Sequence, residues 1–359
     1  MISSERYLRL LKERYKLTDE EARSLFPFGG LDVEAADRMS ENVVGIISRP
    51  LTIIPGLVVN GEEYLVPVVT EQSSIIPMVE KGIAFSRQSG GFTAENTGSI
   101  MIGQIQVQDV PDKNRGIEQV LLHKHEILAE ANKLSSRRKA TDVKARSLET
   151  NVGPMLIVEL FVDVRDSMGA NIVDAMVEEV SPIVESLTEG RVGVRVVSNL
   201  ASERLIRVNV SVDGSVLGGS KVIDDIVAAS YFAEADPYRA TTHNKGIMNG
   251  VSSILLALGN DTRAVEAGAH TYAAITGRYR PLSTWRRDGA WLVGKLVLPM
   301  AVGIVGGAVS THPTAKVALK ILGVKTATEL GEVAAAIGLA CNLGALHTLV
   351  TDGITSIKV

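Results

Sequence analysis

The sequence has almost no cysteine: Cys341 is the only one among 359 residues. A single cysteine excludes a disulfide framework within the chain and any metal site built from cysteine thiolates. Because chains without disulfides are typical of reducing compartments, we expect a cytoplasmic protein.

The sequence also lacks a surplus of basic residues and a signal peptide. The formal net charge is −4 and the isoelectric point is about 5.9, which argues against a general nucleic-acid binder. The first residues, MISSERYLRLLKERYKL, are charged and contain no apolar core. The one long apolar stretch, 290–309, contains Lys295, Pro299 and several glycines. It therefore favours glycine-rich buried strands and turns over a membrane span.

Motifs for metal binding and for serine hydrolases are missing as well. The six histidines are scattered, and His123 and His125 would point to different faces of a helix. No G-x-S-x-G nucleophile elbow occurs. We therefore expect no metal site.

What remains is the composition of an ordinary globular protein, 45% hydrophobic and 22% charged. The length predicts two or three domains.

The first segment is predicted to be helical, with a capping box from Thr18 to Glu21. Asn60-Gly61 between two β-branched runs predicts a hairpin, and a helix is expected after Ser73, with Pro77 in its first turn.

The middle of the chain predicts a separate α/β unit. Between about 102 and 199, strand-like and helix-like patterns alternate, with an apolar strand over 155–164 and an amphipathic helix over 172–187. After Ala201 the chain returns to strands and then to long helical patterns, over roughly 245–275 and 327–350. Asp288-Gly289 marks a turn or hairpin. The simplest plan is a large domain made of both ends of the chain, with a smaller domain inserted.

Asp166-Ser167-Met168-Gly169-Ala170-Asn171 follows the apolar strand and opens the amphipathic helix. Backbone N–H groups at a helix start favour an anion, and small residues let a phosphate approach. The motif is not the G-x-G-x-x-G of a Rossmann fold. The alternative interpretation is a capped helix start without a ligand.

Three further positions could carry chemistry. Lys245, in His243-Asn244-Lys245-Gly246, stands at the start of the predicted helix, where the helix dipole disfavours a cation, and it could stabilise an oxyanion. Glu71 directly follows an apolar strand and could donate a proton. Asp261 alone reads as a turn residue or a helix cap. The alternatives for Lys245 and Glu71 are a surface lysine and a solvated loop glutamate.

Two basic clusters are candidates for a phosphate of CoA or of a cofactor, the alternative being a solvated face. They are Arg137-Arg138-Lys139 and Arg286-Arg287.

The order and wording of seven segments closely resemble the signature segments of class II 3-hydroxy-3-methylglutaryl-CoA (HMG-CoA) reductases. They are ENVVG at 41–45, TE at 70–71, DSMGAN at 166–171, DPYRA at 236–240, HNKGIMNG at 243–250, GND at 259–261 and RAVEAGAH at 263–270. The resemblance covers nearly the whole chain from about Glu41 to Gly353.

The resemblance implies an NAD(P)H-dependent, four-electron reduction of HMG-CoA to mevalonate and free CoA in the mevalonate pathway of isoprenoid biosynthesis. It implies an α+β fold, in which a large mixed α/β substrate domain (1–103 and 200–359) carries a small, non-Rossmann, ferredoxin-like domain (104–199) for NADH or NADPH. It also implies a homodimer with active sites at the interface, and it leaves higher oligomers open.

Carried over by position, the resemblance implies a catalytic set of Glu71, Lys245 and Asp261, which would titrate as one cluster. It implies substrate contacts at Ser73, Arg239, Asn249 and Asn199. It implies cofactor contacts at Asp166, Met168, Gly169 and Asn171.

This sequence departs from the family pattern at its end. Where the family continues into a Gly-His-Met segment and a C-terminal flap, Lys358 stands in the place of the thiolate-protonating histidine. His347 does not match that position, and Cys341 replaces a glutamine. The sequence is either a truncated form of a normal enzyme or a natively flapless chain, and from a flapless chain we expect thioester reduction to be slower than aldehyde reduction. The alternative is a non-catalytic CoA-binding relative.

The choice between NADH and NADPH stays open at this point. It depends on whether a carboxylate or a cation meets the adenosine ribose. Glu130 and Arg137-Arg138 lie in the plausible region and indicate opposite answers.

Overall fold

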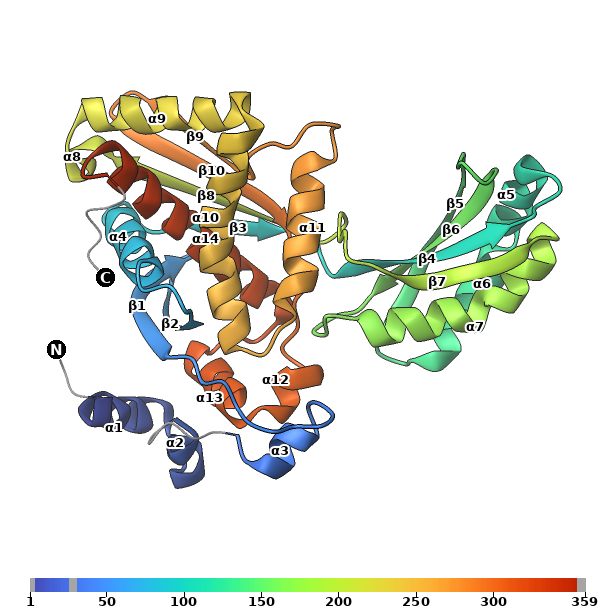
Figure 1. Ribbon diagram of the computed structural model, residues 1–359, viewed down its shortest axis with the longest axis horizontal. Helices are drawn as coiled ribbons and strands as arrows, with labels where there is room; N and C mark the ends of the chain where they lie inside the picture. Colours follow the sequence, from blue (N-terminus) through green and yellow to red (C-terminus); the bar gives the residue numbers. More distant parts are fainter. Residues whose placement is uncertain (1–3, 26–30, 354–359) are drawn as a thin grey trace. The chain divides into compact units, whose positions relative to one another are not determined.

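The computed structural model describes residues 4–25 and 31–353, and Lys358 lies outside them (Figure 1). The chain is a mixed α+β protein and divides into two compact units. The small unit comprises residues 97–205 and 299–301, and the large unit comprises the rest.

The N-terminal helices confirm the predicted capping box. They are α1 (Ser4–Tyr15), α2 (Asp19–Leu25) and α3 (Val33–Asp37). Glu21 N–H donates to Thr18 Oγ1 at 3.2 Å, and Thr18 N–H donates back to Glu21 Oε2 at 2.7 Å. This exchange satisfies two N–H groups that a helix start leaves without a partner.

The Asn60-Gly61 hairpin is confirmed. It joins β1 (Leu51–Val59) to β2 (Glu62–Val69) as antiparallel neighbours. Both turn residues have positive φ, 52° and 85°, which an Asn-Gly pair tolerates. A short turn then leads into α4 (Ile75–Arg87), with Pro77 in its first turn as expected.

The large unit also contains a four-stranded sheet in the order β3-β8-β10-β9. Its strands are β3 (Thr93–Asn96), β8 (Leu205–Asp213), β9 (Ser283–Asp288) and β10 (Trp291–Pro299). β9 and β10 form the hairpin expected at Asp288-Gly289. Its remaining helices are α8 (Gly214–Leu217), α9 (Ser220–Ala235), α10 (Pro237–Ala257), α11 (Thr262–Ala274), α12 (Gly307–Thr311), α13 (Pro313–Leu322) and α14 (Ala327–Val350).

The single helix predicted over 245–275 is wrong, because the chain breaks between α10 and α11. Gly259 has a φ of +67° and Asp261 caps α11 through its side chain. α10 also begins earlier than predicted: Asp236 caps it and Pro237 fills its first position. Lys245 therefore lies in the middle of a helix, and the argument from the helix dipole does not apply to it.

Helix α14 forms the centre of the large unit. It is long and apolar enough to cross a membrane by composition, but 78% of its most apolar window is buried inside the protein. It packs against α4, α9 and α10. Glycines allow the closest approaches: a Cβ on Gly82 would lie 2.0 Å from Ala340 O, and one on Gly344 would lie 2.0 Å from Met78 O.

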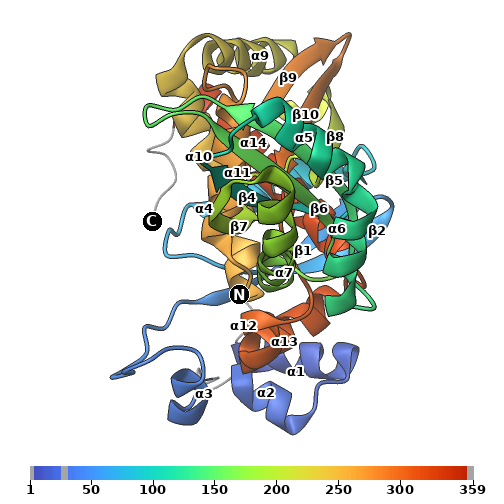
Figure 2. The same cartoon turned by 90° about the vertical axis from the view of Figure 1, so that its right-hand side faces the viewer.

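The small unit is a four-stranded antiparallel sheet in the order β5-β6-β4-β7. Its elements are β4 (Ile100–Gln108), α5 (Lys113–Leu122), α6 (Lys124–Ala131), the 3₁₀ helix η1 (Asn132–Leu134), β5 (Lys139–Leu148), β6 (Met155–Asp163), α7 (Ala170–Thr188) and β7 (Arg191–Ser198). Helices α5, α6 and α7 contact one another and the sheet, so they lie together on it (Figures 1 and 2).

The close approach of α4 to α14 gives a stability prediction. We expect Gly82→Ala to lower the free energy of unfolding by about 1–3 kcal/mol, because the new methyl overlaps a backbone carbonyl. Gly246→Ala on α10 is the control, since nothing lies within 4 Å of its Cβ position and helical glycines gain up to about 1 kcal/mol as alanine. Urea denaturation measures both, and equal midpoints would refute the close packing.

Candidate functional site

The sequence-predicted site residues fall into two sets, one in each unit. The large unit holds Glu71, Ser73, Arg239, Lys245, Asn249 and Asp261. The small unit holds Asp166, Met168, Gly169, Asn171 and Asn199.

The turn between β2 and α4 meets the middle of α10. Lys245 Nζ donates to Gln72 Oε1 at 3.0 Å, and Gln72 N–H donates to Thr70 Oγ1 at 3.1 Å. Glu71, with a side chain 70% exposed, lies 3.4 Å from the guanidinium of Arg49. The structure thus brings Lys245 to Gln72, the residue that follows Glu71. Sequence reasoning missed Gln72, although its place between Glu71 and Ser73 was a signal.

Helix α10 carries two further predicted site residues, Arg239 and Asn249. Asn249 is one turn after Lys245 and therefore projects from the same side. Arg239 is six residues earlier, about 9 Å along the helix axis. It is half-buried, and burial lowers its pKa. Six residues of helix also place Arg239 about 120° around the helix axis from Lys245, so only Asn249 shares the face of Lys245.

Asp261 lies at the other end of α10. Twelve residues separate Lys245 from Ala257, the last residue of that helix, a rise of about 18 Å. Asp261 accepts hydrogen bonds from the N–H groups of Arg263 and Ala264, both at 3.1 Å. Across the described residues, no hydrogen bond or ion pair joins Asp261 to Lys245 or Glu71. Within one chain it is a helix cap, as its residue type alone indicated.

A buried polar network supports α10 just before Lys245. His243 Nε2 is 2.6 Å from Ser283 Oγ, and Asn342 Oδ1 accepts from Ser283 Oγ at 2.9 Å and from Trp285 Nε1 at 2.7 Å. Burial, with a smaller effect of the nearby Arg239 charge, lowers the pKa of His243 to about 3. His243 is therefore neutral at physiological pH, and its role is to fix the helix.

Cys341, which departs from the family pattern, and His347, the nearest histidine to the missing acid, are both engaged in packing. Burial raises the pKa of Cys341 to about 12, so its thiol stays protonated. His347 Nε2 bonds Leu217 O at 3.0 Å, and the ring packs on Phe85. Burial lowers the pKa of His347. His347 thus acts as a packing residue, consistent with its mismatch to the acid position.

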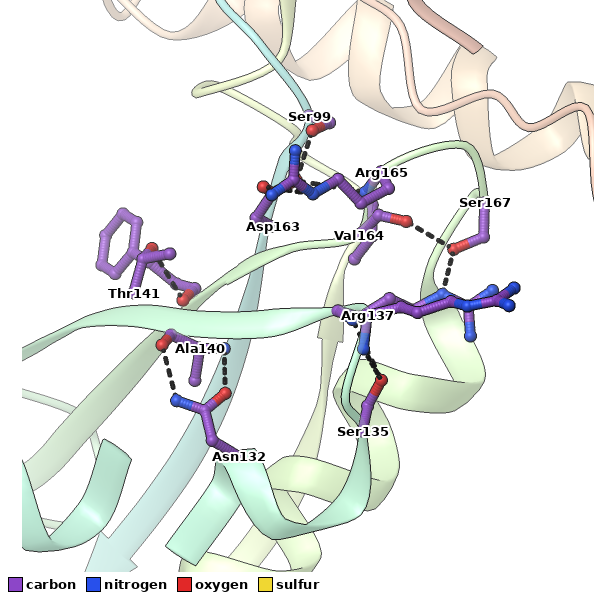
Figure 3. A network of polar contacts seen from close by, with 12 residues as sticks. Ser99, Asn132, Ser135, Arg137, Ala140, Thr141, Asp163, Val164, Arg165 and Ser167 are labelled. Carbon is purple, nitrogen blue, oxygen red and sulfur yellow. Dashed lines mark hydrogen bonds and ion pairs between the residues drawn. The ribbon is translucent and has the colours of Figure 1, made fainter. Parts of the chain in front are cut away.

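In the small unit, the loop between β6 and α7 is tightly bound to its own framework (Figure 3). Asp163 accepts a hydrogen bond from Ser99 Oγ at 2.5 Å and pairs with Arg165 at 3.0 Å. Ser167 Oγ donates to Val164 O at 2.8 Å. Gly169 has a φ of +106°, and a Cβ there would lie 2.5 Å from Val164 Cγ1, so this position requires glycine.

Helix α7 begins without a side-chain cap. Its N-cap residue is Gly169, which has no side chain to accept the first N–H groups. The capped helix start considered above thus has no side-chain cap, and the binding of an anion there stays a prediction. The start of α7 keeps the N–H groups and the dipole that attract an anion.

Arg204 is a residue that sequence reasoning missed. Only 2% of its surface is exposed, and its Nη1 donates to Ser167 O at 3.2 Å and to Met168 O at 3.4 Å. Burial lowers its pKa to about 10, so it remains charged at neutral pH. An arginine directly ahead of an apolar strand, five residues after Asn199, was the available signal.

The first basic cluster lies against the same loop. Arg138 Nε donates to Ser167 Oγ at 3.1 Å, and Ser135 Oγ accepts the N–H groups of both Arg137 and Arg138 (Figure 3). Over residues 4–25 and 31–353, neither arginine has a carboxylate within ion-pair distance. Glu130, in contrast, is paired with Lys133 at 2.6 Å.

The second basic cluster has structural partners. Arg286 makes two bonds to Glu234, at 2.8 and 2.7 Å, and lies over the ring of Tyr231. Arg287 pairs with Asp224 at 2.7 Å. Of the two clusters, Arg137-Arg138-Lys139 is the better candidate for a phosphate.

Comparison with known proteins gives a consistent result. Residues 3–356 match the family model described as hydroxymethylglutaryl-coenzyme A reductase. The chain is 47% identical to 3-hydroxy-3-methylglutaryl-coenzyme A reductase of Archaeoglobus fulgidus, over 98% of this chain and 82% of that protein. It is 30% identical to the probable reductase of Borreliella burgdorferi, over 88% and 74%.

A solved structure matches the whole fold. It is the class II 3-hydroxy-3-methylglutaryl-CoA reductase from Streptococcus pneumoniae, bound to NADPH in open conformations. The match has a TM-score of 0.93 and 37% identity, and it covers 98% of both chains.

The neutral state of His243 gives a pH prediction. Its folded pKa, about 3, is below the unfolded value of 6.5, so the unfolded chain binds the proton more tightly. Its contribution to stability is present above pH 6.5 and is lost as pH falls toward 3. We expect a slope of up to about 1.4 kcal/mol per pH unit in that window.

The slope is measured by urea denaturation between those pH values, with His243→Gln as the comparison. Other titrating groups remain in both proteins, so the difference between their curves isolates His243. Parallel curves would contradict the assignment of a neutral, buried His243.

Proposed function

The chain belongs to the hydroxymethylglutaryl-coenzyme A reductase family, and on that premise we propose which of its residues bind substrate and cofactor and which act in the reaction. It is an HMG-CoA reductase, an oxidoreductase of the mevalonate pathway, and it resembles the class II enzymes. The observation that carries the assignment of the site is the contact of Lys245 with the turn that contains Glu71.

We propose that Lys245 stabilises the oxyanion that forms at the reacting carbonyl. A nicotinamide supplies the hydride, and each transfer leaves negative charge on that oxygen. A fixed ammonium lowers the energy of this charge, and Gln72 holds it in place at 3.0 Å. Glu71, adjacent to Gln72, is the proton donor in this proposal. Ser73 and Asn249 bind the substrate beside it.

Arg239 binds the free carboxylate of the substrate in this proposal. A guanidinium matches a carboxylate with two parallel hydrogen bonds. Arg239 is half-buried on the same helix as Lys245, and burial strengthens such a pair relative to one in water.

Asp261 completes the catalytic set from a second copy of the chain. The rise of about 18 Å along α10 separates it from Lys245 in one chain, yet the family pattern assigns both to one site. A homodimer with active sites at the interface reconciles the two, because each site then takes Asp261 from the other subunit.

The small unit binds the nicotinamide cofactor in this proposal. Its strand order, β5-β6-β4-β7 with helices after β4 and β6, supports a ferredoxin-like, non-Rossmann arrangement. Asp166, Met168, Gly169 and Asn171 form the cofactor loop, and the start of α7 fits a pyrophosphate because it offers N–H groups without a side-chain cap. Asn199, exposed after β7, is the active-site asparagine of this unit.

We assign the enzyme to the cytoplasm. The single cysteine, Cys341, is free and buried. Among the described residues, the one helix that is long and apolar enough to span a membrane is α14, which is mostly buried in the protein.

Substitution of Lys245 tests the catalytic assignment. We expect Lys245→Met to lower kcat with HMG-CoA by about 10²–10³-fold, the loss typical of an oxyanion-stabilising donor. Lys221→Met is the control, because Lys221 is an exposed partner of Asp225 on α9. The assay follows NADPH oxidation by absorbance, with HMG-CoA and with mevaldehyde.

The two substrates separate the remaining possibilities. Retention of more than half of kcat in Lys245→Met would exclude Lys245 as the oxyanion group. Binding of both ligands to the unsubstituted chain without turnover would instead indicate a non-catalytic CoA-binding protein.

NADPH is the cofactor we propose, and Arg138 with Arg137 selects it. Ser167 fixes Arg138 through Nε, which leaves its terminal nitrogens for the phosphate on the adenosine ribose. Glu130 is neutralised by Lys133 and is a poor acceptor for a free ribose hydroxyl.

We expect Arg138→Gln to weaken NADPH binding by about 10- to 100-fold and NADH binding by less than about threefold. Cofactor fluorescence measures both constants. Arg146→Gln is the matched control, because it removes an arginine of β5 that is paired with Glu159 of β6. Equal losses for the two cofactors would mean that Arg138 does not discriminate between them.

A further inference from the structure

The cofactor loop is held from inside the small unit by a buried cation. Arg204 donates from Nη1 to two successive peptide carbonyls, Ser167 O and Met168 O. The loop is also attached through Ser167 Oγ, which donates to Val164 O and accepts from Arg138 Nε. Arg204 is nearly inaccessible to solvent, so it cannot itself touch a bound cofactor.

Because the peptide group is planar, the hydrogen bonds from Arg204 to the two carbonyls also fix the direction of the N–H groups that follow them. In a trans peptide the C=O and the following N–H point in opposite directions. When Ser167 O and Met168 O face Arg204, the N–H groups of Met168 and Gly169 face away from it. In the described part of the chain, neither N–H is bonded to another protein group. Both lie directly before the uncapped start of α7.

We propose that Arg204 is a positioning residue for the cofactor, which turns the N–H groups of Met168 and Gly169 outward so that they extend the anion site at the start of α7. This inference rests on the proposed function of the loop. A neutral side chain at position 204 would leave the two carbonyls without their shared donor. The peptide groups could then rotate, and the N–H groups would no longer converge on an anion.

The charge of Arg204 is compensated by its surroundings. The side chain stays protonated at neutral pH, and Asp163 and Asp166 both lie close enough to interact with its charge. Because these carboxylates compensate the buried cation, Arg204 acts on a bound anion through the peptide groups that it orients. The guanidinium is suited to this position, since its planar fork serves several acceptors at once and a lysine ammonium matches that geometry less well.

The test is a comparison of Arg204→Gln and Arg204→Lys in the full chain. We expect Arg204→Gln to weaken NADPH and NADH binding by the same factor, about 10- to 100-fold, the size of effect seen when an orienting neighbour of a binding group is removed. The two cofactors share the pyrophosphate, so equal losses separate Arg204 from Arg138. Arg204→Lys should lose less, and the KM for HMG-CoA should change little in both variants.

A control variant with a similar loss of thermal stability separates an effect on the orientation of the loop from a general loss of stability. Val120 is fully buried on α5, and α5 packs near Thr188, at the opposite end of α7 from the loop. Val120→Ala should lower the thermal midpoint and leave the cofactor dissociation constants unchanged. If it weakened cofactor binding as much as Arg204→Gln at a similar thermal midpoint, Arg204 would be merely structural.

The remaining outcomes are also decisive. Cofactor binding by Arg204→Gln equal to that of the unsubstituted chain would overturn the inference and leave the proposed function intact. A loss confined to NADPH would also overturn it. Failure of the unsubstituted chain to bind either dinucleotide would refute the proposed cofactor loop itself. If Arg204→Gln does not fold, the ratio of NADPH to NADH affinity in Arg204→Lys tests the same inference.

Discussion

The site in the large unit depends on how closely helices can approach α14. Gly82 and Gly344 allow α4 to lie against it, and Gly250 does the same for α10, where a Cβ would be 2.7 Å from Ile337 O. The turn that carries Glu71 leads directly into α4, and Lys245 is on α10. The hydrogen bond between Lys245 and Gln72 is therefore a consequence of backbone packing several residues away.

Two buried polar arrangements fix the orientation of the functional groups by different means. The network around His243 is neutral, and its hydrogen bonds link α10, β9 and α14 without a charge to desolvate. Arg204 keeps its charge, which backbone carbonyls and nearby carboxylates compensate. The neutral network around His243 fixes helix α10, and the Arg204 cation fixes the loop at 167–168. Both His243 and Arg204 are buried.

Local signals in the sequence were reliable wherever they depended on neighbouring residues. The capping box at Thr18, the Asn60-Gly61 hairpin and the helix after Ser73 are formed as the residue types predict. The break after Ala257 was missed, because helical periodicity continues through it and only the positive φ of Gly259 and the cap at Asp261 end the helix. A separate miss placed Lys245 at a helix start: Asp236 and Pro237 begin α10 eight residues earlier, so Lys245 lies mid-helix.

The sequence by itself determined the family and the α+β class, because the signature segments are long and contiguous, and it supplied the candidate site residues. Only the tertiary structure decided which of them meet. It joins Lys245 to Gln72 across 173 positions, separates Asp261 from Lys245 along one helix, and buries Arg204 under the loop at 167–168. The physical reason is that such contacts follow from helix length and from the packing of distant segments, and neither is encoded in any local pattern.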